Sequence, residues 1–290
     1  MALSVLNNIS AIYAENNLNQ TDSSLQKTLT ELSSGSRINS GSDDAAGLSL
    51  ADGLEANEAA LSQSAQNATD GTGLLQTADG ALSQVNNLLN RAVTLATEAA
   101  NGTLNTAQVN SANAEFQNIL TEIGNIGSTT NFNGIQVFSN TATNIVVSDG
   151  TTSGTATFAD EVGALTTASI GQSVPATGTT PGAGENFTTA GISTLTAATA
   201  QNVLTSLTTA IGDVAYQRGI IGANVNQLTA ASNVASAESE NLTSASSAIM
   251  STDYGAATTA MASEQVLSQT GIAALAQANS VQQEVLKLLQ

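Results

Sequence analysis

The sequence contains no cysteine, no histidine and no tryptophan. Without Cys and His, the chain has no disulfide bonds, Cys nucleophiles, Cys/His zinc sites, histidine general bases or Ser-His-Asp triad. Aromatic residues make up only 3% of the chain, and much of the 41% that is hydrophobic is alanine. Because compact interiors are usually filled with larger side chains, this composition favours thin contacts between helices.

Positive charge is also scarce. Lys and Arg total 5 against 23 Asp and Glu, which gives a formal net charge of −18. Phosphate groups bind to clusters of cations, so we expect no nucleic-acid partner and no binding to an anionic membrane through a basic patch. The same charge predicts that close packing of many copies requires low pH, high ionic strength or bound cations.

Long apolar runs and an early basic segment are absent too. No stretch approaches 18 consecutive apolar residues, so we expect no transmembrane helix and no membrane insertion. Lys27 is the first basic residue, and no apolar segment typical of a signal peptide precedes it. A cleaved signal peptide is therefore not expected.

Proline is confined to one part of the chain. Pro175 and Pro181 both lie within 141–190, which is rich in Thr, Ser and Gly and has no Lys or Arg. The flanks carry Ala, Leu, Gln and Asn without proline. The 290 residues allow one to three domains. This composition predicts helices, then short strands or a loop, then helices again.

Apolar periodicity supports this interpretation on the N-terminal side. A stripe that alternates steps of three and four predicts one helix over 44–100, ending at Asn101-Gly102. A second stripe predicts a helix over 109–126. The first stripe consists of Leu74, Ala78, Ala81, Val85, Leu88, Ala92, Leu95 and Ala99.

Both ends of the chain carry heptad repeats, which predict helices that pair with each other or with other copies. Leucines recur at sevens near the N-terminus, and Leu29 lies beside them. A row at sevens also runs from Ala260 to Leu288, with a complementary row that includes Gly271 and Glu264. The self-assembly residues predicted from these repeats are Leu18, Leu25, Leu29, Leu32, Leu267, Ala274, Val281, Val285 and Leu288.

The middle of the chain has a different pattern. Segments 144–148 and 155–158 are rich in β-branched residues and flank Asp149-Gly150, which predicts a β-hairpin. The composition of residues 171–190 predicts a flexible surface loop. The expected fold class is therefore mainly α: a long antiparallel helical rod or coiled-coil bundle with a small β-hairpin in the middle.

The most suggestive polar cluster is Asp43-Asp44 beside Arg37. Carboxylates before an apolar run suit helix capping, and we prefer that role to catalysis because the sequence offers no partner across a pocket. A catalytic Ser or Thr would have only two lysines and the carboxylates as bases. The sequence has no phosphate-binding loop. We therefore expect no enzyme activity, no cofactor and no metal.

Specific motifs appear on the N-terminal side. LSSGSRINS at 32–40 and DDAAG at 43–47 resemble the N-terminal signature of bacterial flagellin. NATDG at 67–71, TADGAL at 77–82 and NFNG at 131–134 are similar to further motifs of that family.

The C-terminal side completes the resemblance. NLTSA at 241–245 and Asp253-Tyr254 resemble one flagellin box, and LAQAN at 275–279 with VLKLL at 285–289 resembles the flagellin terminus. The likeness extends over about 1–138 and 200–290. The motif residues carried over are Arg37, Asn39, Asp43, Asp44, Asn133, Gly134, Asp253 and Tyr254.

The resemblance implies a subunit of the flagellar filament, secreted by the type III apparatus and used for motility. Residues 1–45 with 251–290 would form an inner-core helical pair, disordered until subunits assemble. Residues 46–140 with 196–250 would form a helical rod domain, completed by the hairpin 141–170. A surface loop over 171–195 would replace the outer domains of larger flagellins.

The resemblance also implies partners: other copies in a helical homopolymer, the filament cap, hook-junction proteins and an export chaperone at the C-terminal region. The Toll-like flagellin receptor binds a QRxRELA run in some members, and this chain has NRAVTLA at 90–96. Arg91, Leu95 and Glu115 match that patch, whereas Val93 and Thr94 depart from it. For Arg91 we prefer a surface or inter-subunit contact to receptor binding.

Two alternatives stay open from the sequence. A hook–filament junction protein of the flagellin-like class would share the heptad ends without polymerising indefinitely. An enzyme or binding module built on a helical rod would not need two unpaired heptad ends, and the sequence offers it no catalytic constellation.

Overall fold

The computed structural model describes residues 8–140, 143–148, 157–160, 162–173 and 182–288. Side chains of 157–160 and 285–288 are not described. In this part of the chain the helices are α1 (Ile9–Ser34), α2 (Ala45–Ala100), α3 (Thr106–Thr129), α4 (Ala200–Met250) and α5 (Tyr254–Leu288). The strands are β1 (Asn131–Phe132), β2 (Ile135–Gln136), β3 (Thr143–Val146), β4 (Thr157–Asp160), β5 (Ile170–Ser173) and β6 (Gly182–Glu185).

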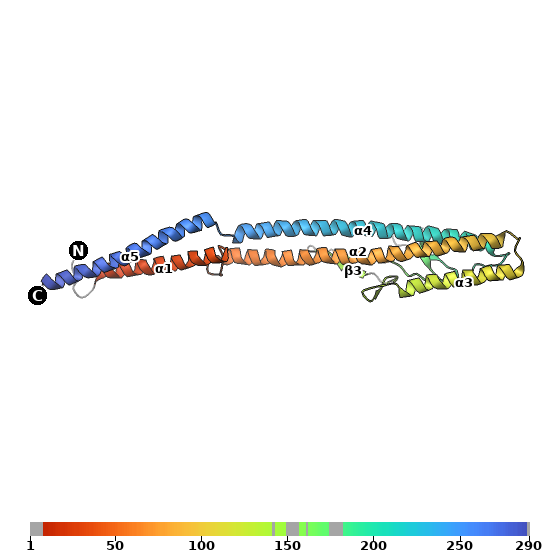
Figure 1. Ribbon diagram of the computed structural model, residues 1–290, viewed down its shortest axis with the longest axis horizontal. Helices are drawn as coiled ribbons and strands as arrows, with labels where there is room; N and C mark the ends of the chain where they lie inside the picture. The colour runs from red at the N-terminus through yellow and green to blue at the C-terminus, as the bar shows by residue number, and fades with distance from the viewer. Residues whose placement is uncertain (1–7, 141–142, 149–156, 161, 174–181, 289–290) are drawn as a thin grey trace. The chain divides into compact units, whose positions relative to one another are not determined.

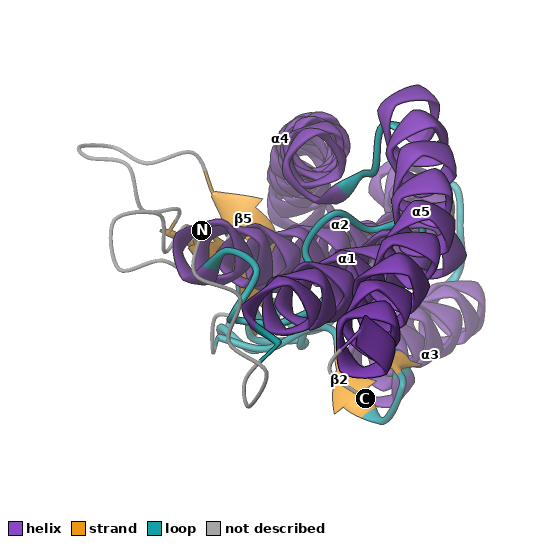
Figure 2. Cartoon of the chain, turned by 90° about the vertical axis from the view of Figure 1, so that its left-hand side faces the viewer, coloured by secondary structure: helices purple, strands orange, loops and turns teal. Residues whose placement is uncertain are grey.

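The strands are short beside the helices (Figure 2) and form three separate antiparallel pairs, β1–β2, β3–β4 and β5–β6. The predicted mainly α class and the predicted helix over 44–100 are thus confirmed. No helix of the described residues is both long and apolar enough to cross a membrane.

The chain divides into two compact units. The terminal unit comprises 1–56 and 241–290, and the central unit comprises 57–240. These divisions fall inside α2 and α4, whereas the domain boundaries expected from the sequence, after residues 45 and 250, fall at the ends of helices.

In the terminal unit, α1 and α5 lie side by side and run antiparallel (Figure 1). The Asn8 Nδ2 atom donates to the Ala278 carbonyl at 3.0 Å, and Ser268 Oγ donates to Asp22 Oδ1 at 3.1 Å. Asn8 also caps α1, because its side chain accepts from Ala11 N. These polar contacts fix which residues of the two helices face each other.

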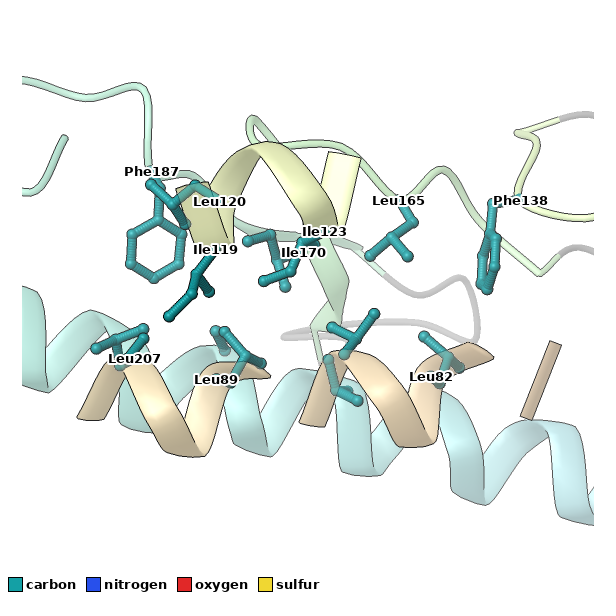
Figure 3. Packing of buried hydrophobic residues seen from close by; sticks show 14 of the residues in the cluster. Leu82, Leu89, Ile119, Leu120, Ile123, Phe138, Leu165, Ile170, Phe187 and Leu207 are labelled. Atoms are coloured by element: carbon teal, nitrogen blue, oxygen red, sulfur yellow. The ribbon is translucent and has the colours of Figure 1, made fainter. Parts of the chain in front are cut away.

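In the central unit, α2, α3 and α4 surround one apolar cluster. The predicted α2 stripe forms one side of this cluster. Figure 3 shows Leu82 and Leu89 of α2 facing Ile119 and Ile123 of α3. Leu82 and Leu89 are fully buried. Burial of one such side chain stabilises the fold by about 1.5–3 kcal/mol. The α3 helix begins with a capping box between Asn105 and Gln108.

The predicted hairpin in the middle is also present. Strand β3 pairs with β4, and Ile145 lies opposite Phe158 in the register. Ile145 is buried. Residues 149–156, which include the predicted turn and the start of the second predicted strand, lie outside the described residues.

The prediction of a surface loop over 171–195 is wrong for 171–173 and 182–185, because these residues belong to the β5–β6 hairpin, whereas 186–195 have no regular secondary structure. Phe187 and Leu195 are buried, and Phe187 packs edge-to-face on Phe116 with ring centroids 6.3 Å apart. Two widely spaced apolar anchors in a Thr/Gly-rich stretch carry little periodic signal. The close packing at Gly171 was also not visible in the sequence. Its φ is +79°, and a Cβ there would lie 2.7 Å from the Asp213 carbonyl carbon. The hairpin therefore sits closer to α4 than any larger residue allows.

Candidate functional site

The N-terminal and C-terminal motifs meet where α1 passes into α2 and α4 passes into α5. Ser36 and Ser251 form an isolated antiparallel bridge. The Arg37 amide donates to the Met250 carbonyl at 2.6 Å, and the Thr252 amide donates to the Gly35 carbonyl at 3.1 Å. We call this part of the terminal unit, residues 35–47 and 249–256, the motif junction.

Gly35 and Arg37 close the helix ends at this junction. Gly35 has φ of +73°, and its amide donates to the Glu31 carbonyl, which ends α1 in a left-handed cap. The Arg37 guanidinium donates to the Ile249 carbonyl at 3.0 Å. That carbonyl lies in the last turn of α4, where the helix dipole favours a cation. Arg37 thus links the connection between α1 and α2 to the end of α4.

Asp43 organises the turn before α2. Its Oδ2 accepts hydrogen bonds from the amides of Asn39 and Ser40 and from the Ser40 hydroxyl. Its Oδ1 lies 3.1 Å from Lys27 Nζ. Hydrogen bonds from Lys27, Ser40 and Asn39 lower the Asp43 pKa to about 2. The expectation that both aspartates cap the helix is therefore wrong for Asp43, because its carboxylate binds the preceding turn and α1.

Asp44 and Asp253 are the helix caps. Asp44 Oδ1 accepts from the Gly47 amide at 2.9 Å, three residues into α2. Asp253 Oδ1 accepts from the Ala256 amide at 3.1 Å, at the start of α5. Tyr254 is 56% exposed, yet its hydroxyl would lie 2.7 Å from a Cβ at Gly35. The left-handed backbone angle is what requires glycine there, because the exposed Tyr254 side chain could shift away from a Cβ.

Asn133 and Gly134 lie in the central unit and are not part of the motif junction. They form the two-residue turn between β1 and β2, with φ of 50° and 79°. Two successive positive φ angles are typical of the hairpin turn that Asn-Gly favours. Their role in this structure is to close the hairpin.

The heptad rows at the two ends have different environments. On α1, Leu18, Leu25 and Leu32 are half-buried, and Leu18 would contact a Cβ at Gly271 of α5 at 3.3 Å. On α5, the residues directed at α1 are those of the complementary row, such as Gly271 and Ala278. The other row is exposed: Leu267 is 55% exposed, Val281 is 44% exposed, and Ala274 is exposed. Leu29 of α1 is 46% exposed, and the side chains of Val285 and Leu288 lie outside the described residues.

The candidate receptor residues do not form one surface patch. Arg91 and Glu115 form a bidentate ion pair between α2 and α3, with distances of 2.7 Å and 3.0 Å. This pairing raises the pKa of Arg91 and lowers that of Glu115. Leu95 is only 2% exposed and belongs to the apolar cluster. The structure therefore does not offer Leu95 as a surface contact.

Two polar groups of the central unit were not singled out from the sequence. Arg218 of α4 makes a bidentate pair with Asp79 of α2, at 2.7 Å and 3.1 Å. The signal in the sequence is that Arg218 takes an apolar position in the stripe that runs over 204–228 at steps of three and four. Asp213 is 8% exposed beneath the β5–β6 hairpin, and burial and the Glu185 charge raise its pKa. In the sequence, a lone aspartate on a helix does not indicate that its side chain is buried.

Comparisons with known proteins agree with the motifs. Residues 5–143 match the bacterial flagellin N-terminal helical region, and residues 204–289 match the bacterial flagellin C-terminal helical region. Flagellin 1 of Proteus mirabilis is 39% identical over 151 residues, which is 52% of this chain and 41% of that protein. Phase 1 flagellin of Salmonella naestved is 41% identical over 139 residues, 48% of this chain and 28% of that protein.

The chain thus spans less than half the length of these curated relatives. The crystal structure of Bacillus cereus flagellin is 30% identical, covers 58% of this chain and 88% of its own, and has a TM-score of 0.47. The two family regions lie in the expected order and together take in both ends of the chain, the motif junction included. The chain belongs to the bacterial flagellin family.

Proposed function

We propose that this protein is a structural subunit that self-assembles into the extracellular bacterial flagellar filament. The observation that carries the proposal is the distribution of exposed apolar side chains. Most large apolar residues that are exposed among the described residues lie in the terminal unit: Ile9, Ile12, Tyr13, Leu29, Leu50, Tyr254, Val266, Leu267, Ile272 and Val281. In this proposal these side chains form the surface through which copies contact one another, because exposed apolar patches mark interaction sites.

The two rows of α5 have different roles in this proposal. The row with Gly271 and Ala278 packs on α1 within one subunit. The row with Leu267 and Val281 is left for neighbouring copies. Burial of apolar surface contributes about 25 cal/mol per Å², so a row that is exposed in the monomer favours association. Head-to-tail contacts of this kind generate an open helix.

The domain assignment stands as part of the proposal. Residues 1–45 with 251–290 form the inner-core helical pair and become ordered on assembly, because alone they bury little apolar surface. Residues 46–140 with 196–250 form the rod domain, and 141–170 completes it. The β5–β6 hairpin adds to this domain through Phe187, which packs on Phe116 of α3.

The ion pairs support a salt requirement for assembly. Lys27, Arg91 and Arg218 are each paired with a carboxylate, and Arg37 is bound to a carbonyl. These pairs leave most of the 23 acidic residues without a basic neighbour among the described residues. Charges within about 8–10 Å repel at moderate salt. We therefore expect polymerisation to be faster at acidic pH or high ionic strength, and equal rates at low and high salt would contradict this.

The test is negative-stain microscopy of purified monomer after addition of ammonium sulfate. We expect long filaments from the full chain and none from a chain that lacks 251–290. The variant Leu267→Asn with Val281→Asn should also fail to polymerise while keeping the helix content of the monomer. Val234→Asn is the matched control, because Val234 is similarly exposed, at 57%, but lies in the central unit.

Failure of the full chain under all conditions would contradict the filament proposal and favour a junction protein. Filaments from the Leu267/Val281 variant would contradict the role of the outer α5 row. Filaments from the wild type together with loss in the Val234 control would place the contacts in the central unit.

Other partners follow from the family alone. We infer contacts with the filament cap and the hook-junction proteins, and an export chaperone at the C-terminal region. For the Toll-like flagellin receptor, the exposed part of the candidate patch is the Arg91–Glu115 pair. A receptor-reporter assay with Arg91→Ala tests this contact, and an unchanged response would leave that pair a tie between α2 and α3.

A further inference from the structure

The chain contains two Asn-Gly pairs with different backbone environments, Asn101-Gly102 and Asn133-Gly134. We propose that Asn101 is a site of spontaneous deamidation in the folded protein and that Asn133 is protected from the same reaction. In this reaction the Gly amide nitrogen attacks the Asn Cγ atom, a C–N bond forms, and the side-chain nitrogen leaves as ammonia. Water then opens the succinimide ring to aspartate or isoaspartate.

Asn101 lies in an exposed turn beyond the end of a helix. It follows the last residue of α2, and both Asn101 and Gly102 are exposed. Its Nδ2 atom donates to Thr103 Oγ1 at 3.3 Å, so the side chain extends forward along the 101–102 peptide.

Asn133 lies instead in the turn of a hydrogen-bonded hairpin. Its φ of 50° places it in the left-handed region. In that conformation the next amide nitrogen points away from the residue's own Cβ, so the attack on Cγ requires the turn to open. The turn is held by the Phe132–Ile135 register and by the bond from the Val137 amide to the Thr130 carbonyl.

Conversion of Asn101 has a structural consequence. It creates a carboxylate just beyond the C-terminal end of α2, where the helix dipole disfavours negative charge. Glu98 already lies in that last turn, and its carbonyl accepts from the Asn101 amide. We therefore expect the last turn of α2 to fray, and the variant Asn101→Asp should show faster amide exchange there than the wild type.

The experiment is incubation of the full chain at mildly alkaline pH, followed by peptide mapping and an isoaspartate assay. In the folded protein we expect residue 101 to convert severalfold faster than residue 133. In urea the two should convert at similar rates, because each is followed by Gly. Asn101→Gln is the control that should remove the fast acidic species seen on isoelectric focusing.

Equal conversion of the two residues in the folded protein would overturn the proposal. A difference that persists unchanged in urea would also overturn it, because neighbouring residues rather than the fold would then set the rates.

Discussion

The terminal and central units are both helical, but they bury different surfaces. The central unit places its leucines, phenylalanines and isoleucines in one continuous cluster. In the terminal unit, the described apolar residues that are buried are Ile38, Ala51 and Ala257. Its helix pair is instead aligned by polar contacts such as Ser268–Asp22. The comparison shows that heptad periodicity does not by itself mean a closed core, because the terminal unit leaves heptad residues such as Leu267 and Val281 exposed.

The largest effect that sharpens this comparison comes from matched leucine truncations. Leu82→Ala should lower the free energy of unfolding of the monomer by about 2–5 kcal/mol, because Leu82 is fully buried in the central cluster. Leu267→Ala, on the exposed row of α5, should leave that free energy nearly unchanged and weaken polymerisation. Urea unfolding followed by circular dichroism measures the first quantity. Equal losses from the two substitutions would break the comparison.

A second effect of similar size tests the β5–β6 hairpin. Phe187→Ala removes the edge-to-face contact with Phe116 and should cost about 3–5 kcal/mol. Hydrogen exchange should then rise in β5 and β6 while α1 and α5 are unaffected. If only the local exchange changes and the unfolding free energy does not, the hairpin is an appendage rather than part of the central core.

These two substitutions mark one place where sequence reasoning worked and one where it failed. The α2 stripe predicted the buried face because small and large apolar residues recur every three or four positions over many turns. The hairpin anchored by Phe187 was missed because single anchors in a Thr/Gly-rich stretch have no period. Gln117 Nε2 donates to the Ser193 carbonyl at 2.6 Å, and the Leu195 amide donates to Asn113 Oδ1 at 2.7 Å. Such bonds between distant segments are not visible in sequence spacing.

The terminal unit was also predicted only in part. The capping role of Asp44 follows from a carboxylate before an apolar run. Which row of α5 faces α1 did not follow, because both rows repeat at seven and the row with the smaller side chains also contains the polar residue Glu264. The small residue Gly271 lies against Leu18, which explains the choice in the structure.

The next prediction concerns the cap at the motif junction. Asp44→Ala removes the acceptor for the Gly47 amide and should destabilise the start of α2 by about 0.5–2 kcal/mol. The effect should appear in the thermal midpoint of filament depolymerisation. Asp44→Asn is the control, because its carbonyl oxygen can still accept the hydrogen bond, and it should retain most of the stability.

The fourth prediction compares the pH dependence of the two units. Burial and the nearby Glu185 charge raise the pKa of Asp213 above its ordinary 3.8. The native central unit therefore takes up this proton more readily than the unfolded chain, so its stability falls as pH rises from 3.8 through the raised pKa. Asp213→Asn should flatten this slope in urea midpoints measured across that range. Glu122→Gln, at an exposed carboxylate of α3, should not change it.

The smallest effect has the opposite sign and belongs to the terminal unit. Asp43 is stabilised as a carboxylate, with a pKa of about 2. The stability that it contributes is present above about pH 3.8 and is lost as the pH falls toward 2. Because the Lys27 side chain is 53% exposed, salt screens this pair. Asp43→Asn should therefore reduce the acid sensitivity of filaments in light-scattering titrations, most clearly at low salt. If the variant and the wild type depolymerise at the same pH, the prediction is wrong. Asp43 then positions the turn, but its protonation does not set the acid stability of the terminal unit.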